Sequence, residues 1–427
     1  MITKLAAPAW ATLEYGWYPL LVFISTPYLL HTLGVEGFGY WMLLTATVGF
    51  GSILNVGTGA ATIKQVSASS GRGESESIGN VISTSLAIAL VGGGLLALFI
   101  LLVFGFAGNV LFAKMGNPSL VLLTGGVAAL LAWIEQVDNV FASALKGAER
   151  FGRAASIEIA SKTAQILAAV LAVSLWGGVA ALYAALMLVA VVRLVAKSWL
   201  AGRVLGVSSL RPSFANVPDM LHYAKWGWLQ GVGGLFFGIA DKMLVGSFLG
   251  AASLAHYSIA TQLAQQIHSL SAAGLSVIFP KVSRRLGGDA NFSLWRITKL
   301  TITGNFLASS FLALGLLIFG KKILTLWLGP VEAEACVEVL WYLTIAYWVL
   351  AINVAPHFIL LGIGRVRFIA LSNIFAGVVS LIIMYVLVQQ QGMVGVGVAR
   401  IVYGVITLVN FVSLLDYIWS RSGKNAK

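Results

Sequence analysis

Seven ionisable side chains interrupt the apolar segments of this 427-residue chain, and they are the first candidates for chemistry. They are Glu135, Asp138, Glu158, Lys162, Asp241, Lys242 and Arg400. A charged side chain in the middle of a membrane-spanning helix costs at least about 2.5 kcal/mol on insertion scales. Each of the seven must therefore be paired, line a polar path or serve a function. Carboxylates could bind a proton or a cation, whereas Lys or Arg could bind a phosphate.

Four of these residues form two pairs at helical spacing. Glu135 and Asp138 are three residues apart, and Glu158 and Lys162 are four apart, so the members of each pair share one helix face. Two interpretations stay open. The four could form an ion-pair cluster that holds two neighbouring helices together. Alternatively, Glu135, Asp138 or Glu158 couples transport to an ion, while Lys162 faces a substrate phosphate.

Arg400 and the adjacent residues Asp241 and Lys242 carry the remaining charges. Arg400 follows a run of small residues, 394–399, that would allow a close helix approach or an open cavity wall. A guanidinium can bind phosphate through two parallel hydrogen bonds, which makes Arg400 a candidate substrate ligand. The alternative is that Arg400 reaches the lipid headgroups. Asp241 could bind a coupling ion and Lys242 a substrate anion, or both could anchor their helix at the interface.

Signatures of enzymatic chemistry do not occur in the sequence. Cys336 is the only cysteine, so an internal disulfide or a thiolate metal site is excluded, and the five histidines lack metal-ligand spacing. No glycine-rich phosphate loop is followed by the required Lys and hydroxyl residue. We therefore predict no catalytic residues, no metal, no cofactor and no enzymatic activity.

The elements that position these side chains follow from composition. Hydrophobic residues make up 59% of the chain and charged residues 10%, against about 25% charged in soluble domains. A bilayer-spanning helix needs about 20 mostly apolar residues. Twelve segments qualify, and they predict an all-α polytopic membrane protein: 12–31, 38–63, 78–107, 119–145, 156–176, 178–200, 222–248, 252–279, 297–319, 337–361, 368–388 and 394–419.

The basic residues predict how these segments are oriented. With a cytoplasmic N-terminus, 21 of the 27 Lys and Arg residues fall in cytoplasmic segments, including Arg193 and Lys197, and three fall in external loops. This asymmetry is typical of membrane topology and places both termini in the cytoplasm. The net charge of +12 therefore orients the chain and is no sign of a nucleic-acid partner.

The two halves of the sequence repeat each other. An offset of 216 places Gly34 on Gly250, and an offset of 215 places Gly147 on Gly362. Parallel repeats are typical of transporters whose substrate path lies between two helical bundles. We expect two six-helix lobes, 1–205 and 206–427, around a central cavity.

Several short motifs, in order along the chain, resemble polysaccharide flippases of the multidrug/oligosaccharidyl-lipid/polysaccharide exporter superfamily. They are Pro27-Tyr28-Leu29-Leu30-His31-Thr32-Leu33-Gly34-Val35-Glu36-Gly37-Phe38-Gly39-Tyr40-Trp41, Leu145-Lys146-Gly147-Ala148-Glu149-Arg150-Phe151, Asp241-Lys242-Met243-Leu244-Val245-Gly246 and Phe279-Pro280. The resemblance implies a fold like that of multidrug and toxic-compound extrusion (MATE) transporters. It also implies translocation of an undecaprenyl-diphosphate-linked oligosaccharide across the bacterial inner membrane by alternating access, for O-antigen, lipopolysaccharide or exopolysaccharide synthesis. The implied partners are the lipid bilayer, the lipid-linked oligosaccharide, and the glycosyltransferases and glycan polymerase of the same pathway.

Other transport or membrane functions are compatible with parts of the sequence. A drug or organic-cation antiporter on the same scaffold would use carboxylates such as Glu135, Asp138 and Asp241. A membrane-embedded glycan polymerase would need a long external loop with catalytic charges, and the predicted loops are short. A flippase for peptidoglycan precursors would usually have two more helices.

Overall fold

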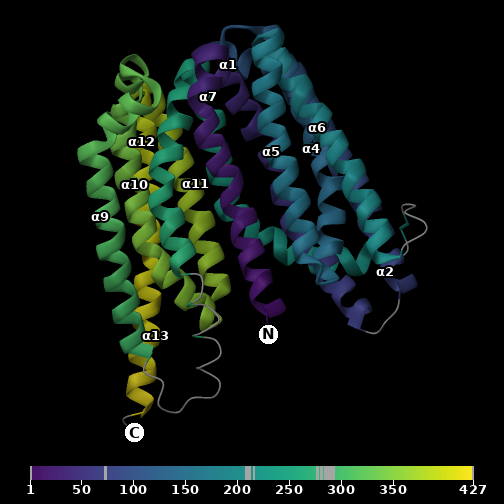
Figure 1. Ribbon diagram of the computed structural model, residues 1–427. Helices are drawn as coiled ribbons and strands as arrows, with labels where there is room; N and C mark the ends of the chain where they lie inside the picture. Colours follow the sequence, from purple (N-terminus) through teal and green to yellow (C-terminus); the bar gives the residue numbers. More distant parts are fainter. Residues whose placement is uncertain are drawn as a thin grey trace. The chain divides into compact units, whose positions relative to one another are not determined.

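Helices make up all the regular structure in the part of the chain that the computed structural model describes, residues 2–71, 75–206, 213–214, 217–275, 278, 282 and 294–425 (Figure 1). The elements are α1 (Ile2–Gly71), α2 (Ser75–Leu102), η1 (Val103–Ala107), α3 (Gly108–Leu111), η2 (Ala113–Met115), α4 (Pro118–Gly147), α5 (Phe151–Trp176), α6 (Gly178–Leu205), α7 (Val217–Leu275), α9 (Leu294–Leu328), α10 (Pro330–Gly362), α11 (Val366–Gln391), α12 (Met393–Thr407) and α13 (Val409–Asn425). The predicted all-α class is confirmed.

Ten helices among the described residues are long and apolar enough to cross a membrane. Two of them contain a break at a glycine with non-helical backbone: Gly34 in α1 (φ 72°, ψ 167°) and Gly250 in α7 (φ 87°, ψ −176°). Glycine suits such positions because it reaches positive φ without steric cost. Dividing α1 and α7 at these glycines gives the twelve predicted segments, and the protein is a multi-pass membrane protein. Phe279-Pro280 lies outside the described residues.

The chain forms two compact units, and we describe each by itself. The first unit comprises residues 1–239 and 250–255, and the second comprises residues 240–249 and 256–427. The lobes 1–205 and 206–427 were predicted from repeats rather than from contacts, and they stay a prediction.

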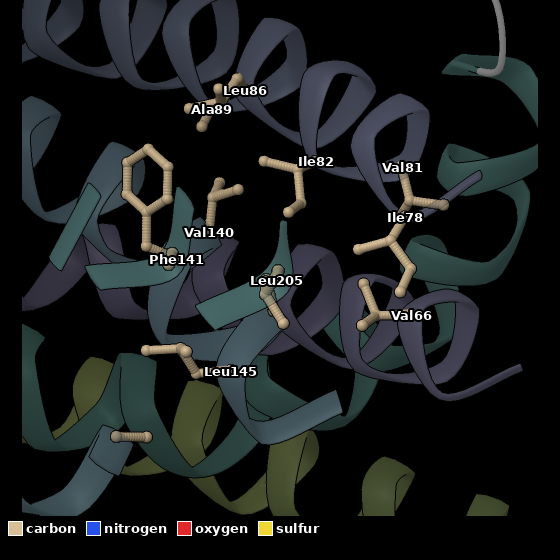
Figure 2. Packing of buried hydrophobic residues seen from close by; sticks show 13 residues of the cluster. Val66, Ile78, Val81, Ile82, Leu86, Ala89, Val140, Phe141, Leu145 and Leu205 are labelled. Carbon is tan, nitrogen blue, oxygen red and sulfur yellow. The ribbon is translucent and has the colours of Figure 1, made fainter. Parts of the chain in front are cut away.

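A buried apolar cluster joins four helices of the first unit. Figure 2 shows Val66 of α1, Ile82 of α2, Phe141 of α4 and Leu205 of α6 within it. Small residues such as Ala144 complete the cluster and allow close helix approach, which drives packing where the lipid is as apolar as the side chains. Gly147 illustrates the tightness, because a Cβ there would lie 2.9 Å from the Ile63 carbonyl oxygen.

The second unit builds its corresponding cluster from repeat-related positions. Its buried residues include Val282, Leu294, Leu360 and Ile369. Offsets of 216 and 215 relate these four to Val66, Ile78, Leu145 and Ala154, which all belong to the cluster of the first unit. The repeat found in the sequence is therefore also a repeat of the packing.

Candidate functional site

Three neighbouring helices of the first unit, α4, α5 and α6, bring six charged side chains together (Figure 1). On α4, residues 135, 138, 139, 142 and 146 form a polar stripe that lines a cavity, whereas 140, 141, 144 and 145 lie in the apolar cluster. This division follows from the 3.6-residue helical period. Helices α5 and α6 contribute stripes of the same spacing. The six charged residues are Glu135, Asp138, Glu158, Lys162, Arg193 and Lys197.

Lys197 is the centre of this charged cluster. Its side chain is 2% exposed, and its Nζ donates to Asp138 Oδ2 at 2.6 Å and to Glu158 Oε2 at 2.5 Å. Charge-assisted hydrogen bonds of this length are the strong ones. Lys162 is more loosely held, since its Nζ lies 3.5 Å from Glu158 Oε1 and its side chain is 26% exposed. The core of the cluster is thus one lysine shared by two carboxylates.

Arg193 stands at the edge of the cluster and has only long contacts. Its Nε lies 3.5 Å from Asp138 Oδ1, and its Nη2 lies 3.8 Å from Glu135 Oε1. It makes no hydrogen bond to any residue that the structure describes, and its Nε is buried without a partner. The cluster therefore balances three formal positive charges against three negative ones, but with very different tightness at its core and at its edge.

The cluster lines a cavity of about 420 Å³. The other side chains of the cavity wall include Tyr18 of α1, Lys146 and Asn139 of α4, and Gln165 of α5. The Lys162 ammonium lies 5.6 Å from the centre of the Tyr18 ring, within the range of a cation–π interaction. The wall thus offers cations, amides and an aromatic ring, a combination that can bind an anionic, hydroxyl-rich group.

Sequence reasoning found four residues of this cluster and misassigned two. Glu135, Asp138, Glu158 and Lys162 do lie together, as their spacing predicted. Arg193 and Lys197 were counted with the cytoplasmic cations because they lie near the end of a span, and the structure corrects this by placing both on the cavity wall. Their separation of four residues was the signal that could have identified them as one face of a helix.

A second charged cluster lies in the second unit, around Asp241. Arg400 Nη1 lies 3.1 Å from Asp241 Oδ2, and the Tyr257 hydroxyl donates to the same oxygen at 2.5 Å. Arg400 Nη2 donates to the hydroxyl of Tyr347, whose ring centre is 5.0 Å from the guanidinium carbon. Arg400 and Asp241 are 4% and 1% exposed, so the pair is sealed within the packed helices.

This second cluster joins residues that the sequence analysis had assigned to different roles. Arg400 was a candidate for substrate binding and Asp241 for ion coupling, yet the two neutralise each other. The guanidinium is turned inward, in contrast to the alternative that it reaches the headgroups. Lys242 contributes its backbone N–H, which donates to Asp241 Oδ1 at 2.7 Å, and its ammonium forms no ion pair with the described residues.

Metal-ligating side chains do not gather within the described ranges, where no three His, Cys, Asp or Glu residues are placed to hold a metal ion. The charges on the cavity wall are instead mixed, with a cation close to each carboxylate. Such a wall is suited to reversible ionic contacts.

Two proteins of known sequence resemble the chain over most of its length. A probable low-salt glycan biosynthesis flippase, Agl15 of Haloferax volcanii, is 24% identical over 383 residues, covering 89% of this chain and 76% of that protein. A putative O-antigen transporter of Shigella flexneri is 22% identical over 398 residues, covering 91% and 92%.

Solved structures share the fold. An inward-facing multidrug resistance MATE transporter has a TM-score of 0.76 at 19% identity and covers 98% of both chains. The lipid II flippase MurJ, in an inward closed conformation, has a TM-score of 0.74 at 12% identity and covers 96% of this chain and 87% of its own. The predicted MATE-like architecture is confirmed. Residues 9–285 match the family described as polysaccharide biosynthesis protein, and the chain therefore belongs to that family.

Proposed function

We propose that this protein is a flippase that moves an undecaprenyl-diphosphate-linked oligosaccharide from the cytoplasmic to the external leaflet of the bacterial inner membrane by alternating access. Both termini then lie in the cytoplasm, as the positive charges predict. Membership of the polysaccharide biosynthesis family supports the proposal, as do relatives named as a glycan flippase and an O-antigen transporter. Translocation of this kind needs no covalent chemistry.

The cavity of the first unit is the observation that carries the proposal. The headgroup of such a cargo is an anionic diphosphate bearing sugars, and it cannot enter hydrocarbon without compensating partners. The cavity wall supplies Lys162 and Arg193 for the phosphates, and Asn139 and Gln165 as hydrogen-bonding groups for sugar hydroxyls. Tyr18 adds an aromatic ring that can pack on a sugar face. The lipid tail would remain in the bilayer.

The candidate site residues take distinct roles in this proposal. Lys162 is the phosphate ligand of the first unit. Asp138 and Glu158 are tied to Lys197, which leaves Glu135 as the carboxylate most available for ion coupling. In the second unit, Arg400 and Lys242 can meet the cargo only if the Arg400–Asp241 pair opens, which would also free Asp241 for an ion.

A second candidate function is export of drugs or organic cations. Glu135 favours it, because this carboxylate is 35% exposed on the cavity wall. The two functions are separable in cells. Loss of drug resistance in the Glu135→Gln or Asp138→Asn variant, with surface glycan intact, would identify the antiporter.

A deletion strain tests the proposed function. We expect lipid-linked glycan to accumulate on the cytoplasmic face, and the wild-type gene to restore surface glycan. The glycosyltransferases and polymerase of the pathway, which we propose as partners, must be present in that strain. Unaltered surface glycan in the deletion strain would contradict the proposal.

A further inference from the structure

Arg193 is a buried cation whose hydrogen-bonding capacity is unused. Its side chain is 10% exposed, lines the cavity and forms no hydrogen bond with the described residues. A guanidinium carries five N–H donors in a fixed fork, and leaving buried donors unsatisfied is costly. The position of Arg193 therefore points to an acceptor that reaches it from the cavity.

The other charges of the cluster cannot supply that acceptor. Asp138 and Glu158 both direct one oxygen to Lys197, at 2.6 and 2.5 Å. The second oxygen of Asp138 faces Arg193 Nε at 3.5 Å without forming a hydrogen bond. A carboxylate held this firmly by Lys197 is not free to move toward Arg193.

Glu135 differs from the other two carboxylates in how it is held. Its side chain is 35% exposed, and its one ion pair is the 3.8 Å contact with Arg193 Nη2. That distance exceeds a hydrogen bond, and an ion pair this exposed is worth little. Glu135 lies beside the guanidinium as a weakly bound anion that another anion could replace.

We propose that Glu135 is a displaceable counter-anion for Arg193. Before cargo enters, Glu135 keeps the buried guanidinium from being an uncompensated charge, whose cost would be high. A diphosphate then displaces Glu135 and binds Arg193 through its fork, with Lys162 as a second cation on the same wall. This inference rests on the proposed function and deepens it, because it assigns the phosphate position and a built-in competitor.

A built-in competitor also makes release possible. A transporter that held a diphosphate with two uncompensated cations would bind it too tightly to let it go on the other side. By competing for Arg193, Glu135 lowers the affinity for the diphosphate in every conformation in which it can reach the guanidinium.

Binding of inorganic pyrophosphate to the purified full-length protein in detergent, measured by isothermal titration calorimetry, tests this inference. We expect Glu135→Gln to tighten binding about tenfold, and Arg193→Gln to weaken it by a similar factor. Glu334→Gln is the matched control, since it removes one negative charge from an exposed ion pair with Lys321 in the second unit. The control should bind pyrophosphate as the wild type does.

Two outcomes would overturn the inference: a Glu135→Gln variant that binds pyrophosphate no more tightly than Glu334→Gln, or a folded Arg193→Gln variant that binds as the wild type does. If Arg193→Gln fails to fold, the comparison of Glu135→Gln with Glu334→Gln decides alone. Arg193→Lys keeps the charge but loses the fork, so it should bind with intermediate affinity.

The source of the phosphate is tested with the same variants in lipid nanodiscs and undecaprenyl diphosphate as the probe. Tighter binding by Glu135→Gln supports a lipid-linked headgroup. An effect on inorganic pyrophosphate alone would overturn the assignment to cargo. Failure of the proposed function would look different, because the wild-type gene would then not restore surface glycan even though the pyrophosphate affinities changed as expected.

Discussion

The two units share one repeat but differ in what they bury between corresponding helices. At the offset of 215, Asp138 falls on Asn353 and Glu158 falls on Asn373. In the second unit, Asn410 donates to Asn353 at 3.2 Å, and Asn410 in turn accepts a hydrogen bond from Ser372 at 3.3 Å. The first unit thus has an ionic cluster where the second has neutral amides and a hydroxyl.

This difference bears on why the ionic cluster exists. Burying charges carries a desolvation cost that a neutral hydrogen-bonded network avoids, and replacing a buried ion pair is often neutral or stabilising. The second unit shows that the repeat packs without charges at these positions. Holding the helices together is therefore a poor explanation for the cluster of the first unit, and a role in binding explains it better.

The second unit has its own charges at the opposite end of the repeat. Asp241 lies nine residues before the Gly250 break, and Arg400 lies in the first two turns of α12. The positions related to them in the first unit are Ser25 and Ala185, which carry no charge. Under the proposed topology, the first unit is charged in its cytoplasmic half and the second in its external half, an asymmetry suited to moving an anion in one direction.

Removal of Lys197 should have the largest effect on stability. Lys197→Met leaves Asp138 and Glu158 buried without their shared cation, which we expect to cost about 4–5 kcal/mol. Asn410→Leu in the second unit should cost only about 1–2 kcal/mol, the cost of leaving neutral groups unpaired. Thermal unfolding in detergent measures both. Equal losses for the two variants would remove the contrast between the units.

Breaking the Arg400–Asp241 pair should have the next largest effect. Arg400→Met should cost about 3 kcal/mol, because Asp241 keeps the hydrogen bonds of Tyr257 and of the Lys242 backbone. The double variant Arg400→Met/Asp241→Asn should recover about 1–2 kcal/mol of the summed single losses, as expected for residues in contact. Strict additivity in this cycle would show that the two side chains do not depend on each other.

A transplant of the second unit's residues tests the comparison directly. The triple variant Asp138→Asn, Glu158→Asn, Lys197→Asn gives the first unit neutral amides and strands no carboxylate at Lys197. We expect its unfolding temperature to lie closer to the wild type than that of Lys197→Met, while restoration of surface glycan in the deletion strain is lost. Full restoration of glycan by the triple variant would show that the ionic cluster serves no binding role.

Much of the fold and part of the site followed from local sequence signals. Span lengths, the charge asymmetry and the glycine at each break are local, so the twelve segments and the breaks at Gly34 and Gly250 were predictable. The meeting of Glu135, Asp138, Glu158 and Lys162 was predictable because helical spacing fixes a face. The pairing of Arg400 with Asp241 was not, because 159 positions separate them and only tertiary packing brings them together. Depth along the chain, without direction around the helix, placed Lys197 with the surface cations.

Lys162 should show the smallest effect on stability and a clear effect on transport. Its ammonium is 26% exposed and 3.5 Å from Glu158, which Lys197 already neutralises, so Lys162→Gln should change stability by less than about 1 kcal/mol. Loss of one phosphate-facing cation should nevertheless slow restoration of surface glycan about tenfold, a difference of about 1.4 kcal/mol in binding. Lys322→Gln, which removes a cation outside the cavity wall, serves as the control for net charge. If Lys162→Gln transports as well as Lys322→Gln, the cargo's phosphate does not depend on Lys162, and the binding role of the cluster rests on Arg193.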